Sequence, residues 1–317
     1  MDGFTLLNGL ENLLSETSDS TWLHPYVAYS FLYKAAIMTV ERSQCLTSSQ
    51  DITTVDGSSK YSLDADFHRL YLMDDQNRYF VKVNDGTNTY FIYWNSYDSV
   101  VLGNNTTETA IPTGFSIIDA PALAQKTGTT TSDGILVNPY TIYQQDLGET
   151  TLTDTLASFT TVKVGDTVHN TTDGSHGKVI AITSSTAIVC ALFYGHNNYF
   201  SSGDSYIINP QARFYLVLDP PSSTSGYTVT VPYIQKPDPV FSYYRRYKIQ
   251  SGYEDALIQY AAWLYKYRDQ QPNYGDAWFK YWDATVRQLG KVTNQALGKR
   301  DFHVNLSKRA GKSWTYR

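Results

Sequence analysis

Apolar residues recur every three or four positions near both ends of the chain, a spacing that predicts amphipathic helices. A short helix is expected over residues 4–14 and a long one over 22–45, with Pro25 tolerated only in its first turn. Residues 251–298 predict two further helices, separated at Pro272 because proline removes a hydrogen-bond donor and restricts the residue before it. Both ends of the chain are therefore expected to be helical.

The C-terminal helix pair has a wide aromatic face. Ser251 and Glu254 have the S-x-x-E spacing of a capping box at its start. On the first helix the apolar face consists of Tyr253, Ala256, Leu257, Tyr260, Ala261 and Leu264. On the second helix one side carries Trp278, Tyr281, Thr285, Leu289, Val292 and Ala296. Such faces must pack on something, and the helix over 22–45 is the natural partner within a helical core.

Between the helical ends the pattern alternates with a period of two, which is typical of strands. Residues 52–63 predict a hairpin that turns at Asp56 and Gly57. Further strands are expected over 67–73, 78–83, 89–94, 109–119, 213–221 and 227–237, whereas 97–101 could form one helical turn.

A second all-β region interrupts this sheet. Residues 121–131 are small, polar and without period, which is typical of a linker. Short strands broken by Gly, Asp and Asn turns follow as far as residue 209, and they predict a small barrel or sandwich. The expected fold class is α+β, with a helical bundle and β-meander over 1–121 and 210–298, an inserted all-β domain over 122–209, and an extended basic arm over 299–317.

Composition narrows the possible functions. The 317 residues are 42% hydrophobic, enough for real cores, and a net charge of −5 argues against a protein built to wrap nucleic acid. Cys45 and Cys190 lie in segments assigned to different domains, so no disulfide framework is expected and synthesis in a reducing cytoplasm fits. Residues 1–14 lack a basic start and no long apolar run follows, so neither a secretory signal nor a membrane span is expected.

The 27 tyrosines and 6 tryptophans have two possible explanations. These side chains supply large, stiff contact areas and are enriched at protein interfaces. The alternative is a tyrosine-rich β protein in which the rings only fill the cores.

The last residues are locally basic in an acidic protein. After Gly290 the only acid is Asp301, whereas the cations are Lys291, Lys299, Arg300, Lys308, Arg309, Lys312 and Arg317. No helix or strand period continues beyond Gly298. The segment is either a solvated end or an arm that folds onto an acidic or DNA-lined surface, with Trp314 and Tyr316 as anchors.

Side chains that could carry chemistry form no established motif. Asp166, His169, Asp173 and His176 lie close together and could bind a metal, but their spacing matches no tight ligand set and Asp-Gly is ordinary turn material. Nucleophile-elbow, phosphate-loop and zinc-protease motifs are absent from the sequence. A glycosidase carboxylate pair has no support. We therefore expect no catalytic residue, no metal site and no cofactor.

The order of elements resembles that of the head-to-tail adaptor (connector) proteins of tailed bacteriophages. The resemblance rests on the F-x-I-I-D segment at Phe115–Asp119, on the strand pair within Leu216–Pro237, and on the Ala- and Tyr-rich helix with an acidic first turn at Tyr253–Asp269. In that family a strand ending in Asp and Pro-Pro precedes a Y-x-x-x-P strand and a closing helix. The resemblance covers about two thirds of the chain, and the segment 122–209 has no counterpart in minimal adaptors.

The resemblance implies a non-enzymatic virion protein of the neck, made in the host cytoplasm. It would form a ring, typically a dodecamer, below the portal protein, bind a tail or second neck protein, and let genomic DNA pass without specific binding. The portal-docking arm would comprise Lys299, Arg300, Phe302, His303, Lys308, Arg309, Lys312, Trp314, Tyr316 and Arg317. The helices between subunits would contribute Trp22, Tyr26, Tyr29, Tyr33, Tyr260, Trp263, Trp278 and Tyr281.

Two other functions stay open. A tail-associated receptor-binding or decoration protein would use the inserted β-domain, whose tyrosines could stack on sugars. A tail-associated hydrolase would need carboxylates that the sequence does not place.

Overall fold

The computed structural model describes residues 1–15, 23–71, 81–95, 109, 111–121, 123–137, 149–268 and 272–296. The chain divides into two compact units, Met1–Leu46 with Arg246–Arg317, and Thr47–Arg245. Helices and antiparallel strands are both present and strands dominate, so the predicted α+β class is confirmed. The predicted helical turn at 97–101 and the predicted arm at 299–317 lie outside the described residues.

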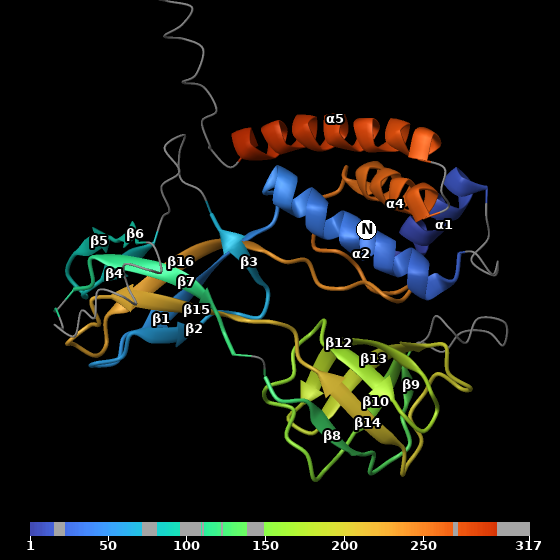
Figure 1. The fold of residues 1–317 in the computed structure, drawn as a ribbon, viewed down its shortest axis with the longest axis horizontal. Helices are drawn as coiled ribbons and strands as arrows, with labels where there is room; N and C mark the ends of the chain where they lie inside the picture. Colours follow the sequence, from blue (N-terminus) through green and yellow to red (C-terminus); the bar gives the residue numbers. More distant parts are fainter. Residues whose placement is uncertain are drawn as a thin grey trace, which may run out of the picture. The chain divides into compact units, whose positions relative to one another are not determined.

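The first unit contains helices from both ends of the chain, and Figure 1 shows α4 and α5 side by side. Its helices are α1 (Gly3–Leu14), α2 (Pro25–Ser43), α4 (Glu254–Arg268) and α5 (Pro272–Ala296). Pro25 is the first residue of α2, as predicted, where its missing N–H breaks no helical bond. In α1, Asp2 caps the helix by accepting a hydrogen bond from the Thr5 N–H at 2.8 Å.

The first residue of α4 differs from the predicted one. The helix begins at Glu254, whose carboxylate accepts a hydrogen bond from the Gly252 N–H at 2.6 Å. The predicted capping box with Ser251 at the cap is therefore wrong, because the chain turns at 251–252 before the helix starts. Of the predicted apolar face of α4, Tyr253, Ala256, Leu257, Tyr260 and Ala261 are buried, whereas Leu264 is only partly buried.

The buried stripe of α5 also differs from the expected one. It consists of Gly275, Trp282, Val286 and Gly290. Tyr281, which was expected on the apolar side, is 61% exposed. A Cβ on Gly290 would lie 3.3 Å from the Ser43 Cα, so glycine is what allows α5 to approach the end of α2 this closely.

The second unit contains two sheets that enclose one hydrophobic core. One sheet comprises β1 (Thr47–Thr53), β3 (Phe67–Leu70), β4 (Lys82–Asn84), β5 (Thr89–Phe91) and β16 (Thr228–Gln235). The other has the order β2 (Lys60–Ser62), β15 (Phe214–Asp219), β7 (Gly114–Asp119) and β6 (Tyr93–Trp94). Strand β16 pairs with β1, β3 and β4, and its alternate residues Val229, Val231 and Tyr233 are buried in the core.

The hairpin predicted at Asp56 and Gly57 is wrong. Strand β1 pairs with β16 and strand β2 pairs with β15, so the two predicted arms belong to different sheets. The chain crosses between the sheets here and again between β15 and β16. Backbone bonds from Thr54 to Tyr227 (2.8 Å) and from Gly226 to Thr54 (3.0 Å) connect the two crossings.

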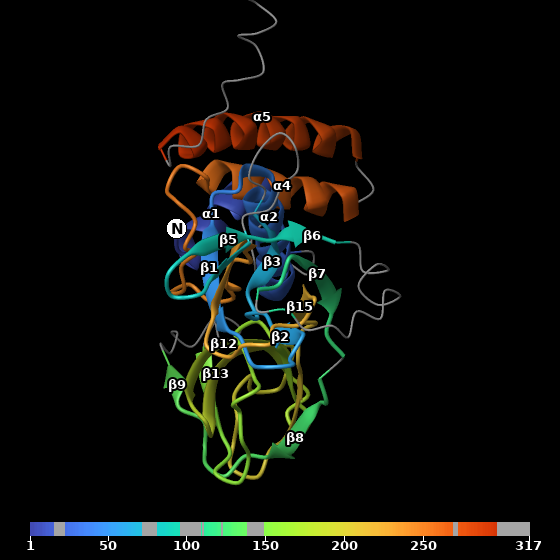
Figure 2. The same ribbon diagram turned by 90° about the vertical axis from the view of Figure 1, so that its left-hand side faces the viewer.

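A seven-stranded antiparallel sheet forms the rest of this unit (Figure 2). Its order is β8 (Lys126–Thr129), β14 (Ser205–Asn209), β11 (Thr167–Asn170), β12 (His176–Ser184), β13 (Ala187–Phe193), β10 (Glu149–Thr153) and β9 (Leu136–Val137). The sheet curls, because the Thr131 N–H at the end of β8 donates to the Thr153 carbonyl of β10 at 2.9 Å. All its strands come from within 122–209, and the predicted domain boundaries themselves stay a prediction.

Two strands of this sheet were not foreseen. Residues 126–129 were expected in a linker, but they form the edge strand β8 on β14. Strand β10, with the sequence Glu-Thr-Thr-Leu-Thr, carries little apolar alternation. Backbone hydrogen bonds form a ladder regardless of side chain, so polar strands at such positions leave a weak pattern in the sequence.

A buried ion pair connects β10 to the segment after β16. Glu149 is fully buried and accepts two hydrogen bonds from the Arg245 guanidinium, both at 2.8 Å, and one from the Ser242 hydroxyl at 2.5 Å. A buried carboxylate with three charge-assisted or hydroxyl donors is well compensated, and removal of one partner leaves its charge uncompensated.

We predict that Arg245→Ala lowers the free energy of unfolding by about 3 kcal/mol, because it leaves the buried Glu149 carboxylate without the cation that compensates its charge. Urea unfolding of the full chain measures this. The matched control is Arg246→Ala, an exposed neighbour, with an expected loss of less than about 1 kcal/mol. Adding Glu149→Gln to Arg245→Ala should restore part of the loss; a double variant as unstable as the single one would contradict the explanation.

Candidate functional site

An aromatic cluster joins α4 to α5 and extends from the core to the surface. Tyr260 contacts Trp282 with ring centroids 4.7 Å apart, and Trp263 contacts Phe279 at 5.0 Å. Trp282 is 3% exposed, and its Nε1–H donates to Thr39 Oγ1 of α2 at 3.0 Å. The inner part of the cluster is therefore the core of the first unit.

Exposed aromatic rings lie on two different sides of the hairpin. Tyr267 is 63% exposed beside Trp263, which contacts the 38% exposed Phe279. Tyr281 is 61% exposed beside Trp278, at a centroid distance of 6.3 Å. At about 100° per residue, Phe279 and Tyr281 point about 160° apart around the helix. The hairpin therefore presents two separate aromatic surfaces, here called the Phe279 flank (Trp263, Tyr267, Phe279) and the Tyr281 flank (Trp278, Tyr281).

The predicted interface residues fall into three groups. Tyr29 and Tyr260 are buried within the first unit, and Tyr26 and Tyr33 are partly buried on α2. Trp263, Trp278 and Tyr281 belong to the two flanks. Trp22 and all residues of the predicted arm, Lys299, Arg300, Phe302, His303, Lys308, Arg309, Lys312, Trp314, Tyr316 and Arg317, lie outside the described residues. Tyr267 and Phe279 are exposed residues of the hairpin that the sequence analysis did not select.

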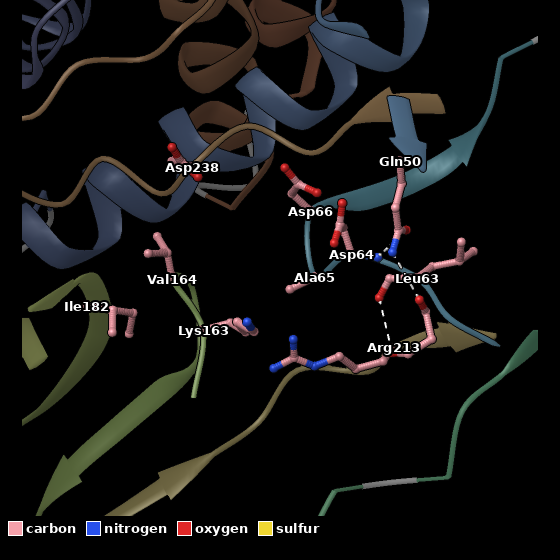
Figure 3. A pocket seen from close by; sticks show the side chains of 11 residues that line it. Gln50, Leu63, Asp64, Ala65, Asp66, Lys163, Val164, Ile182, Arg213 and Asp238 are labelled. Atoms are coloured by element: carbon pink, nitrogen blue, oxygen red, sulfur yellow. Dashed lines mark hydrogen bonds between the residues drawn. The ribbon is translucent and has the colours of Figure 1, made fainter. Parts of the chain in front are cut away.

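A polar pocket of about 510 Å³ opens in the second unit (Figure 3). Three carboxylates line it: Asp64 and Asp66 from the turn between β2 and β3, and Asp238 from the segment after β16. Two cations line it as well: Lys163 from the loop before β11, and Arg213 from the start of β15. In Figure 3 the Lys163 and Arg213 side chains point toward one another, with the aspartates on the other side of the pocket.

The acidic side of the pocket is held by β16. Asp66 accepts hydrogen bonds from the Tyr233 hydroxyl at 2.8 Å and from Gln235 Nε2 at 2.6 Å. The same hydroxyl lies 3.4 Å from Asp64 Oδ2. Burial and the two nearby carboxylates raise the pKa of Tyr233, so its phenol stays protonated and continues to donate at neutral pH.

The basic side is held by a buried carboxylate. Arg213 is 9% exposed, and its Nη2 donates to the Thr161 carbonyl at 3.2 Å and lies 3.6 Å from Asp166 Oδ2. Asp166 also accepts from the backbone N–H groups of Gln211 and Lys163, both at 2.9 Å. Burial raises the pKa of Asp166, and these hydrogen bonds and the Arg213 charge oppose the rise. The Arg213 Nε–H is buried and has no hydrogen-bond partner among the described residues.

The residues considered for a metal have structural contacts. Asp166 binds Arg213 and two backbone N–H groups, and Asp173 accepts from the Asn197 and Asn198 N–H groups. His169 and His176 face each other across β11 and β12, with ring centroids 5.9 Å apart. Within the part of the chain that the structure describes, no group of three His, Cys, Asp or Glu side chains is arranged to hold a metal ion.

Neither Cys45 nor Cys190 forms a disulfide within the described part of the chain, and Cys190 is buried in β13. Of the helices described, none combines the length and the apolar character needed to cross a membrane. Comparison with models of protein families finds no family that matches this chain. Comparison with curated proteins likewise finds no match. The function must therefore be argued from the sites themselves.

The division of the aromatic cluster into core and surface is testable by stability. We predict that Trp282→Ala lowers the free energy of unfolding by about 3–5 kcal/mol, because it empties a buried site and removes the partner of Thr39. Tyr281→Ala and Tyr267→Ala should each change it by less than about 1 kcal/mol, because both rings are exposed. Denaturant unfolding of the three variants measures the difference, and equal losses in all three would contradict it.

Proposed function

We propose that the chain is a structural virion protein, a head-to-tail adaptor that forms a ring below the portal and joins the DNA-filled capsid to the tail. The observation that carries the proposal is the pair of aromatic flanks on the α4–α5 hairpin, in an element order that resembles phage adaptors. Exposed aromatic side chains on a helix pair are typical of protein interfaces.

The two flanks support a ring in particular. A closed ring is built from heterologous contacts, in which one surface of a subunit binds a different surface of the next. A two-fold dimer would need only one self-complementary surface. The Phe279 flank of one copy would contact the Tyr281 flank of its neighbour, and repetition would close the proposed helical ring wall.

The remaining features of the proposal rest on the sequence. The basic segment 299–317 would dock on the portal, with its cations guiding the encounter and Trp314 and Tyr316 as anchors. The net charge of −5 suits a channel through which DNA slides without adhesion. The finer architecture of the family, a helical bundle that carries an inserted β-barrel or sandwich at 122–209, belongs to the same proposal.

One observation favours a second candidate, a tail-associated receptor-binding or decoration protein. In the seven-stranded sheet His176 stacks on Tyr194, with centroids 5.2 Å apart, and Tyr194 is 47% exposed. A stacked, exposed ring pair is a surface on which a sugar ring could lie. With His169, whose ring centroid lies 5.9 Å from that of His176, the pair forms a short row of rings. The adaptor proposal, in contrast, accounts for both helical flanks.

The ring contact predicts a specific pattern of assembly. Tyr267→Ala and Tyr281→Ala, on opposite flanks, should each weaken self-association on the portal at least about tenfold, because a buried aromatic anchor contributes about 2 kcal/mol or more. Lys280→Ala, on the exposed side of α5, is the matched control and should assemble normally.

A mixture of the two tyrosine variants tests most directly whether the contact is heterologous. In a heterologous ring a mixture restores one intact contact per pair, so native mass spectrometry should show pairs but not complete rings. Full rings from either variant alone, or from the mixture, would contradict the assignment of the flanks.

The arm makes a separate prediction. Removal of residues 299–317 should abolish portal binding, measured by co-sedimentation, and leave the unfolding transition of the body unchanged, because the segment has no apolar periodicity with which to join a core. A charge-preserving control replaces Trp314 and Tyr316 by Ser and should weaken binding less than the deletion. A truncated chain that still assembles on portals would contradict the proposed role of residues 299–317.

A further inference from the structure

The pocket in Figure 3 has a feature that the adaptor proposal does not use, namely charges of opposite sign on its two sides. Lys163 and Arg213 face Asp64, Asp66 and Asp238 across the pocket. Its volume of about 510 Å³ lies within the range of small-molecule sites. The cavity is therefore large enough for a small ligand, and it has positive charges on one side and negative charges on the other.

Both sides are positioned before any ligand arrives. Tyr233 and Gln235 hold the Asp66 carboxylate by hydrogen bonds of 2.8 and 2.6 Å. Thr161 and Asp166 hold the Arg213 guanidinium through its Nη2 alone. Groups fixed by their neighbours lose little conformational freedom on binding, which favours affinity.

The state of Arg213 points to a missing acceptor. Its side chain is nine-tenths buried, it lines the pocket, and its Nε–H has no partner among the described residues. Buried N–H groups in proteins are nearly always paired, so an unpaired one next to a cavity calls for an oxygen acceptor. An oxyanion in the pocket would meet the guanidinium that lines it, with Lys163 beside it.

A ligand with charge of only one sign would be repelled by one side of this pocket. An anion bound to Arg213 and Lys163 would lie in the field of three aspartates. A cation bound to the aspartates would lie in the field of the two basic side chains. A ligand that carries both signs avoids both repulsions, because each end meets the opposite charge.

We propose that this pocket binds a small zwitterion, with its carboxylate against Arg213 and Lys163 and its ammonium group against the three aspartates. The ligand class is that of free amino acids and their ω-amino homologues. This binding is independent of ring formation, since the pocket lies wholly within the second unit and the aromatic flanks lie within the first.

Isothermal titration calorimetry of the full chain tests the proposal with three zwitterions of increasing charge separation: glycine, 4-aminobutyrate and 6-aminohexanoate. Each is compared at matched ionic strength with the carboxylate and the amine that carry only one of its groups. At least one zwitterion should bind about tenfold or more tightly than both of its halves, since each charged contact is worth about that factor.

Variants assign the binding to the pocket. Lys163→Gln, at an exposed loop position, and Asp238→Asn should each weaken the best zwitterion about tenfold, because each removes one charged contact. Lys280→Gln, an exposed lysine of α5 far along the sequence, is the matched control and should bind normally. If no zwitterion binds more tightly than its halves, or if Lys163→Gln binds as the parent does, the proposal is wrong. Failure of ring assembly in the tyrosine variants would leave this result unaffected.

Discussion

The fold depends on the packing of helices from opposite ends of the chain. α4 packs against α1, α2 and α5, and the approach is close enough that a Cβ on Gly9 of α1 would clash with the Ile258 side chain of α4. Buried Trp282 of α5 donates to Thr39 of α2 across the same core. Helices α1 and α2 from the start of the chain and α4 and α5 from its later part belong to one compact unit. The segment between them in the sequence, residues 47–245, forms a second unit with hydrophobic cores of its own. Burial of apolar surface between the two ends thus sets the organisation of the molecule.

The same helices connect this organisation to function. Once one face of the α4–α5 hairpin is buried, Tyr267, Phe279 and Tyr281 remain at the surface. Exposed rings on a rigid pair of helices cost little conformational entropy when a partner covers them. Two flanks on one hairpin are the minimum that a closed ring of identical subunits requires. The proposed adaptor function is therefore an extension of the packing that already holds the first unit together.

Sequence periodicity predicted the helices because each has a continuous apolar face, as with Tyr253, Leu257 and Tyr260 in α4. It misplaced the face of α5, where aromatic residues surround most of the helix and the close approach at Gly290 decides which side is buried. It placed most strands but not their partners: Asp56 and Gly57 form a turn, yet the strands beside it join different sheets, and pairing across about 170 residues leaves no local signal. The pocket was missed for the same reason, since Asp64, Lys163, Arg213 and Asp238 come from four separate segments.

The central claim is that this protein joins head to tail, and electron microscopy of virus particles produced without it tests that claim most directly. The account predicts tailless heads that are empty or leak DNA, because the portal would lack the ring on which a tail assembles. Complete, tailed particles that fail to adsorb to their host would contradict it and would move the function to host recognition by the β-rich segment 122–209.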